Sequence, residues 1–194
     1  MKLIAAVFVL VASQFVVHAG KTRSIQKPKP DLRGTWKLDS HKRIDGKVIK
    51  ATNDTLLVVQ QLETEIKFIE NQGGVNEQVL IYFSDGRGED NPSGLSFNFA
   101  SREPDPAQFE EKVRTKTKWD GDKLVARALL RRVVNGHTLT YEIIKEWKLS
   151  KDRNSLTVTT RRINKNATGI EVRGPGLLRP DMPIETKEVY LRRT

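Results

Sequence analysis

The stretch that decides the fold is KVRTKTKWDGDKLVARALLRRVVNGHTLTYEIIKEWKLSKDRNSLTVTTRRI, residues 112–163. From Lys112 to Trp119 basic residues alternate with other residues, a period of two that is typical of a strand with one face in water. Asp120-Gly121 and Asn135-Gly136 suit tight hairpins, because both dipeptides adopt positive φ at little cost. We therefore predict antiparallel strands over 112–119, 124–134, 139–149 and 156–163, with a further turn at 151–154.

Shorter strand patterns lie on both sides of this meander. In 31–39 (DLRGTWKLD), alternate residues from Leu32 to Leu38 share one face. Further strands are expected over 55–61, 65–70, 78–84, 95–100 and 185–193, the last pairing back onto the first if the sheet closes. The polar segments 41–54 and 85–94 are expected to be connections. The predicted fold class is all-β, an antiparallel up-and-down meander β-barrel of about eight to ten strands.

The N-terminal residues predict export. Lys2 precedes an apolar run from Leu3 to Val17, and Val17-His18-Ala19 is a small-residue cleavage pattern. A run of about 15 apolar residues is short of the roughly 20 that span a bilayer, so we expect a signal peptide over 1–19 rather than a membrane anchor. Cleavage after Ala19 would make the protein secreted or periplasmic, and not an integral membrane protein.

One barrel domain is expected after the signal. Residues 20–31 are rich in proline and lysine and are predicted to be a linker. The domain then spans 32–194, a length that suits a single domain. It includes a long Gly- and Pro-rich loop at 164–184, which could be a binding lid or a plain crossover.

Cysteine is absent from the 194 residues, which removes disulfides, thiolate metal sites and thiol nucleophiles. Because secreted eukaryotic proteins of this kind usually carry disulfides, the absence favours a bacterial exported protein. The net charge is +10, and loss of Lys2 with the signal leaves +9. This excess favours anionic partners, although it also suits a well-solvated exported protein.

No enzymatic constellation is recognisable, and neither a cofactor nor a metal is expected. After signal removal only His41 and His137 remain, both in or beside polar turns, and two distant histidines do not define a zinc site. No Gly-x-Ser-x-Gly elbow occurs. Asp85, Glu89 and Asp90 do not follow a calcium-loop spacing, so we expect a solvated turn there.

The first strand carries a family resemblance. Gly34-Thr35-Trp36 resembles the Gly-x-Trp motif of the lipocalin and wider calycin superfamily. The runs 118–125, 146–150 and 156–159 resemble secreted bacterial lipocalin-like proteins. The resemblance implies a barrel whose closed end is plugged by the tryptophan. It also implies an arginine of the last strand stacked on that tryptophan, here Arg192 or Arg193.

Alternation then assigns side chains to the barrel interior, including Val79, Ile81 and Phe83 on 78–84. Lys145 and Arg162 fall in phase with apolar neighbours, and a buried cation needs a carboxylate from the protein or from a ligand. We therefore predict a cavity for a small apolar or amphipathic molecule with an acidic head. Alternatively, both cations reach water at the strand ends and the aromatics are plain core. The candidate ligand-binding residues are Trp36, Phe97, Phe99, Trp119, Tyr141, Lys145, Trp147 and Arg162.

The outer face offers a different function. Basic residues of two neighbouring strands share it, and they could contact anionic lipid or polysaccharide at the cell envelope. Nucleic acid is disfavoured because Trp119, the neighbouring aromatic, points to the opposite face, and base stacking needs exposed rings. A solvated surface is the bland alternative. The candidate contact residues are Lys112, Arg114, Lys116, Lys118, Arg127 and Arg131.

Overall fold

The computed structural model describes residues 28–42, 45–73, 76–92, 112–134, 137–165 and 184–193, and all regular structure in these ranges is β-strand. The strands are β1 (Gly34–Lys42), β2 (Val48–Lys50), β3 (Thr55–Leu62), β4 (Glu65–Gln72), β5 (Asn76–Phe83), β6 (Glu89–Pro92), β7 (Lys112–Asp120), β8 (Lys123–Val134), β9 (His137–Leu149), β10 (Ser155–Asn164) and β11 (Ile184–Arg192).

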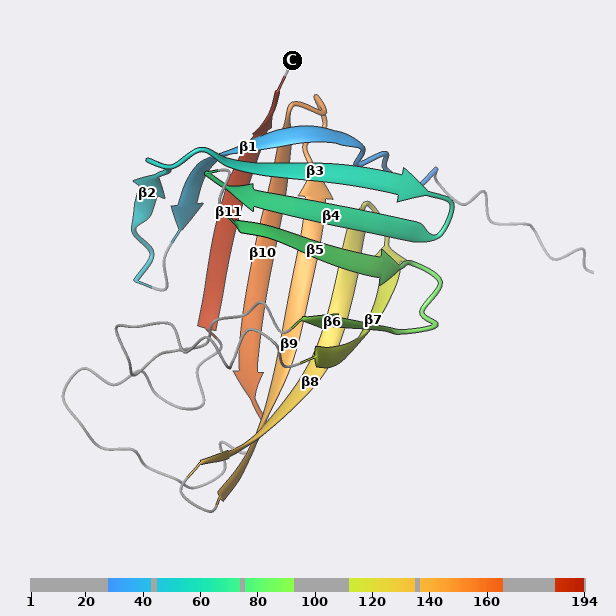
Figure 1. The fold of residues 1–194 in the computed structure, drawn as a ribbon, viewed down its shortest axis with the longest axis vertical. Coiled ribbons are helices and arrows are strands. Elements are labelled where there is room, and N and C mark those ends of the chain that lie inside the picture. The colour runs from blue at the N-terminus through green and yellow to red at the C-terminus, as the bar shows by residue number, and fades with distance from the viewer. Residues whose placement is uncertain are drawn as a thin grey trace, which may run out of the picture.

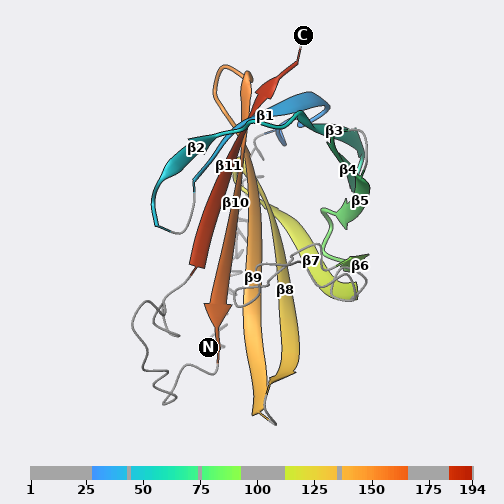
Figure 2. The same ribbon diagram turned by 60° about the vertical axis from the view of Figure 1, so that its left-hand side comes forward.

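The strands form one antiparallel sheet that curls into a barrel (Figure 1, Figure 2). Its order is β5-β4-β3-β1-β11-β10-β9-β8-β7-β6, and the short β2 pairs with β1 outside this path. Strands that pair are successive in the chain except for β1 with β3, between which the chain forms β2, and for β11 with β1, the predicted pairing of the last and first strands. The successive strands β5 and β6 stand at the two ends of this order and are not paired. The predicted all-β meander barrel is therefore confirmed.

Two hairpins of the central meander lie where the alternation and the turn residues predict them. β7 ends at Asp120 and β8 begins at Lys123, and Gly121 between them has a φ of 60°. β9 and β10 pair from Leu149↔Leu156 to Tyr141↔Asn164. The predicted Asn135-Gly136 turn, the strand at 95–100, the signal peptide and most of the linker and long loop lie outside the described residues.

Side chains close the barrel where β5 meets β6. The Asn91 carboxamide acts like a peptide group, since its Oδ1 accepts from Ile81 N at 2.9 Å and its Nδ2 donates to Ile81 O at 2.7 Å. The Glu89 carboxylate accepts from Phe83 N at 3.1 Å, and at 2.6 Å from each hydroxyl of Thr115 and Thr117. These bonds replace a backbone ladder along the β5–β6 seam.

The same contacts correct one prediction. Segment 85–94 is not simply a solvated loop, because it contains β6, and Glu89 is only 5% exposed. A buried carboxylate is tolerable here because it accepts three hydrogen bonds. Of the acidic residues in this segment, Glu89 is therefore buried and stabilises the barrel, whereas Asp90 is exposed at the surface.

Most of the core is one cluster that joins β1, β3, β4 and β5 to β8, β9, β10 and β11. It contains inward residues of all these strands, among them Leu57, Ile66, Leu124 and Leu156. The predicted inward face of β5 is wrong: Leu80 and Tyr82 are buried, whereas Val79, Ile81 and Phe83 are only partly buried. QVLIYF is apolar on both faces, so alternation carries no information about its direction there.

Candidate functional site

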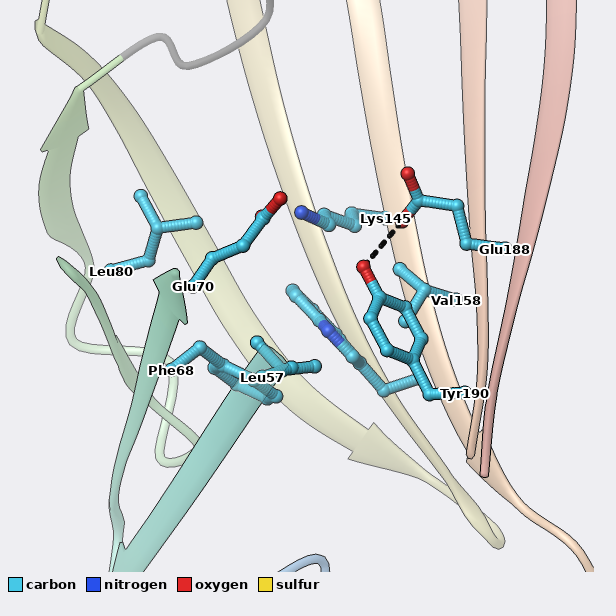
Figure 3. Close-up of a pocket in the computed structure, with 9 residues that line it drawn as sticks. Leu57, Phe68, Glu70, Leu80, Lys145, Val158, Glu188 and Tyr190 are labelled. Carbon is cyan, nitrogen blue, oxygen red and sulfur yellow. Dashed lines mark hydrogen bonds between the residues drawn. The ribbon is translucent and has the colours of Figure 1, made fainter. Parts of the chain in front are cut away.

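A small pocket lies inside the barrel between β3, β4 and β5 on one side and β9, β10 and β11 on the other (Figure 3). Its volume is about 10 Å³, room for roughly one water molecule. Apolar side chains supply most of its walls and four polar ones share it. The lining residues are Leu57, Phe68, Leu80, Trp147 and Val158 together with Glu70, Lys145, Glu188 and Tyr190.

The floor of this pocket is formed by a cluster of three aromatic rings, of which Phe68 and Trp147 line the pocket and Tyr82 packs behind them. Phe68 stacks on Trp147 with ring centroids 4.8 Å apart. Tyr82 meets both rings edge-on, at 5.6 Å from Phe68 and 4.8 Å from Trp147. Offset and edge-to-face pairs of this kind hold each ring in a defined position. The floor joins β4 and β5 to β9 across the barrel.

The polar lining residues converge from three strands, β4, β9 and β11. The Tyr190 hydroxyl donates to Glu188 Oε2 at 3.2 Å. Lys145 extends between Glu188 and Glu70 in Figure 3, and its Nζ lies 5.4 Å from the centroid of the Trp147 ring. The carboxylates that a buried Lys145 requires are therefore supplied by the protein itself.

Burial sets the protonation of this cluster. Desolvation raises the pKa of Glu188 above its ordinary value, although the nearby Lys145 ammonium and the Tyr190 hydrogen bond oppose the rise. Desolvation also raises the pKa of Tyr190, with the Glu188 charge acting in the same direction. Tyr190 therefore keeps its proton and remains a hydrogen-bond donor to Glu188.

The raised pKa of Glu188 predicts a pH-dependent stability. An acid that holds its proton more tightly when folded stabilises the fold fully below its unfolded pKa, near 4.5, and this stabilisation is lost as the pH rises through the folded value. Urea unfolding should therefore show that the stability of the wild type declines as the pH rises through this window, and that the stability of Glu188→Gln does not. The exposed Glu185 lies three residues before Glu188 on β11, on the opposite face, and gives the control: Glu185→Gln should keep the wild-type decline in stability.

The predicted ligand-binding residues divide into several places. Lys145 and Trp147 line the pocket. Trp119 is half-buried against the main core. Further down the barrel, the Arg162 guanidinium stacks over the Tyr141 ring at 3.8 Å, beside a second apolar cluster. Phe97 and Phe99 lie outside the described residues.

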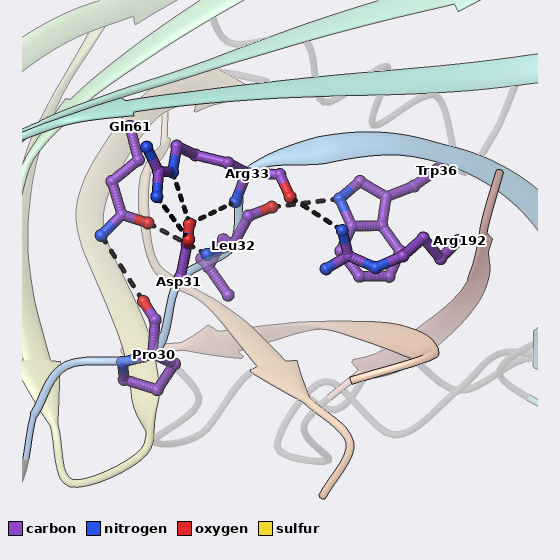
Figure 4. A network of polar contacts seen from close by, with 7 residues as sticks. All are labelled: Pro30, Asp31, Leu32, Arg33, Trp36, Gln61 and Arg192. Atoms are coloured by element: carbon purple, nitrogen blue, oxygen red, sulfur yellow. Dashed lines mark hydrogen bonds and ion pairs between the residues drawn. The ribbon is translucent and has the colours of Figure 1, made fainter. Parts of the chain in front are cut away.

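Trp36 occupies the closed end of the barrel rather than the pocket (Figure 4). Its Nε1 donates to the Leu32 carbonyl at 3.1 Å, and the Arg192 guanidinium lies 4.3 Å above its ring. Arg192 also donates to the carbonyls of Arg33 and Arg153. The tryptophan–arginine plug that the lipocalin resemblance implies is therefore present, with Arg192 as the arginine.

Gly34 makes this plug sterically possible. Its φ is +137°, a conformation that side-chain-bearing residues rarely adopt, and an added Cβ would lie 2.9 Å from Arg192 Nη1. The guanidinium thus lies directly over the glycine. The glycine and the tryptophan of the motif act together. Gly34 leaves space for the Arg192 guanidinium, and the Trp36 ring packs beneath that guanidinium.

Sequence reasoning missed the acidic half of the pocket. On β4, Glu70 is in phase with the buried Ile66 and Phe68 and follows Phe68 by two residues. On β11, Glu188 precedes the buried Tyr190 by two residues. Alternation alone could have flagged both as inward carboxylates. It could not have shown that they meet Lys145, because that contact joins strands far apart in the chain.

The predicted outer contact residues share an exposed surface. All six side chains are exposed on β7 and β8, and Figure 2 shows these strands side by side. A groove of about 750 Å³ runs over this surface and reaches β9. Its lining includes Arg114, Lys116, Lys118 and Arg127; Lys112 and Arg131 lie on the same face.

The described residues contain neither a metal-ligating cluster nor a membrane-spanning helix. No group of three histidine or acidic side chains there could hold a metal ion. No helix in these segments is long and apolar enough to cross a membrane.

The strand order, the plugged end and the partly polar interior define an antiparallel up-and-down β-barrel with an internal pocket. No protein-family model matches the chain, and no curated protein matches its sequence. Three similar solved structures are human cRBP IV (14% identity, 84% of this chain, 99% of that chain, TM-score 0.47), the REP1-NXSQ fatty acid transporter (11%, 84%, 96%, 0.48) and Caenorhabditis elegans lipid binding protein 8 (11%, 83%, 94%, 0.47). At these values the fold assignment rests on the strand pairing described above.

Proposed function

We propose that this protein is an exported binding protein that holds a small apolar or amphipathic molecule inside its barrel. The observation that carries the proposal is the polar cluster of Glu70, Lys145, Glu188 and Tyr190 within apolar walls. Partly buried charges among apolar walls rarely stabilise a fold better than packed apolar side chains would, so their presence here favours a binding role. Export rests on the signal-like residues 1–19.

Ligand entry would require side chains to move. At about 10 Å³ the pocket is nearly filled, and Lys145 and Glu70 are its long, flexible members. An apolar tail would pack against the aromatic floor as these two side chains withdraw. The acidic head is assigned to Arg162 lower in the barrel, whose guanidinium lies 3.8 Å from the centroid of the Tyr141 ring.

The test is native mass spectrometry of the protein purified gently from its own host. We expect a discrete bound mass of small-molecule size, and a fall in its occupancy of about tenfold or more in Arg162→Ala, as loss of one charged contact predicts. Lys145→Met should change the occupancy less. The neighbouring Arg161 points outward and pairs with Glu185 at 2.9 Å, so Arg161→Ala is the matched control and should keep the ligand.

A different outcome would remove the proposal. An apo mass that stays unchanged after incubation with fatty acids, fatty alcohols and isoprenoids would mean that the barrel holds no such ligand. Equal loss in Arg161→Ala and Arg162→Ala would mean that the interior arginine has no special role.

A further inference from the structure

The outer groove over β7, β8 and β9 combines cationic and apolar groups in one place. Arg114, Lys116, Lys118, Arg127 and Lys165 contribute positive charge, and Val125 and Leu129 are apolar. Leu129 is 58% exposed and stands between Arg127 and Arg131 along β8. At about 750 Å³ this groove is far larger than the internal pocket.

The charges are arranged in a way that folding alone does not favour. Lys116 lies directly opposite Arg127 in the β7–β8 pairing, and like charges facing each other across strands are destabilising. Lys123 and Lys148 also face each other, between β8 and β9, and each of them has a carboxylate partner, at 3.2 and 3.3 Å.

Only part of the groove's charge is neutralised from within. Glu142 pairs with Lys165 at 2.6 Å and with Arg127 at 3.2 Å, and Arg114 pairs with Asp90 at 3.1 Å. Among the residues that the structure describes, no carboxylate pairs with Lys116 or Lys118. The two lysines therefore present charge that an external anion can meet.

We propose that this groove docks the protein onto an anionic lipid bilayer, with headgroup phosphates at the lysines and Leu129 in the interfacial layer. A surface that pairs cations with an exposed leucine matches the charged and apolar levels of a membrane interface. A nucleic acid would instead call for aromatic rings for base stacking, and none of the described lining residues is aromatic. The proposal is independent of the internal ligand and adds a surface site to it.

Vesicle flotation tests this directly, using the protein as its host processes it. We expect flotation with phosphatidylcholine vesicles that contain phosphatidylglycerol, little with pure phosphatidylcholine, and loss in high salt as charges are screened. Each basic residue near an anionic surface contributes about fivefold in affinity, so Lys116→Ala with Lys118→Ala should weaken binding about twenty-five-fold. Leu129→Ser should weaken it as well.

Matched variants separate this site from general charge and apolar effects. The double change Lys151→Ala with Lys187→Ala removes two exposed lysines elsewhere, and Leu62→Ser removes a leucine that is 76% exposed elsewhere. Both should bind vesicles as the wild type does. A thermal melt of each variant excludes unfolding as the cause of any loss.

Four results would overturn the proposal. The first is absence of flotation with anionic vesicles, and the second is equal loss in the control variants. The third is competition by soluble glycerol phosphate at the headgroup concentration, which would mean that a free phosphate suffices. The fourth is binding to an anionic polysaccharide or oligonucleotide that matches vesicle binding and is unaffected by Leu129→Ser.

Discussion

Trp36→Ala is expected to lower the free energy of unfolding by about 3–5 kcal/mol, the usual cost of removing a large aromatic side chain from a core. Trp36 is 0% exposed and lies opposite Leu57 in the β1–β3 pairing. Its loss would also leave the Leu32 carbonyl without its donor and the Arg192 guanidinium without the ring beneath it. Urea unfolding followed by far-UV circular dichroism measures the change.

Companion variants show whether the plug acts as described. Trp36→Phe keeps most of the buried ring but loses the hydrogen bond to Leu32. It should therefore lower the free energy of unfolding clearly less than Trp36→Ala does. Arg192→Ala should destabilise because it removes the stack and two carbonyl contacts, whereas the exposed Arg193→Ala should not. A loss below about 1 kcal/mol in Trp36→Ala would contradict the view that the tryptophan seals this end.

Glu89→Ala is expected to be the second severe change and to lower the free energy of unfolding by about 3 kcal/mol or more. Hydrogen bonds to a charged group contribute about 1.5–3 kcal/mol each, and these contributions are not additive. The carboxylate joins β5 to β7 through Phe83 N, Thr115 and Thr117. Without it, a backbone amide and two hydroxyls near the seam lose their acceptor. Urea unfolding gives the energy, and amide hydrogen exchange at Phe83 reports whether the seam opens.

The adjacent Asp90 supplies the control. It is exposed and pairs with Arg114 at 3.1 Å, so Asp90→Ala removes the same charge from the same strand and should leave the stability nearly unchanged. Glu89→Gln keeps the shape but turns one acceptor into a donor, so an intermediate loss is expected. Equal urea midpoints for Glu89→Ala and Asp90→Ala would refute the role of Glu89 in closing the barrel.

Local pattern was enough wherever the chain alternates clearly. β7, β9 and β10 bury Val113, Thr117, Trp147 and Val158, which are in phase with the predicted interior residues Trp119, Lys145 and Arg162. β5 is the contrasting case, because its uninterrupted apolar run permits either face, and only packing against β4 and the seam selects Leu80 and Tyr82. A one-residue shift in a strand exchanges its two faces, so this error reverses the whole strand.

The sites divide in the same way. Lys145 and Trp147 could be chosen as pocket residues from β9 alone, and the outer basic residues from β7 and β8, since each set follows from alternation within a strand. Glu70 and Glu188 were not recognised, although they decide what Lys145 pairs with. The role of Glu89 was likewise invisible in a segment rich in turn residues.

By itself, then, the sequence determined the meander and the return of the last strand to the first, and its lipocalin resemblance implied the tryptophan–arginine plug with either Arg192 or Arg193. Periodicity and turn chemistry act between residues close in the chain, and the plug belongs to a short motif. Only the tertiary structure decided the face of β5, the side-chain seam at Glu89 and Asn91, and the meeting of Glu70, Lys145 and Glu188. Those features depend on contacts between distant strands, where burial and charge compensation are set by neighbours that no local pattern specifies.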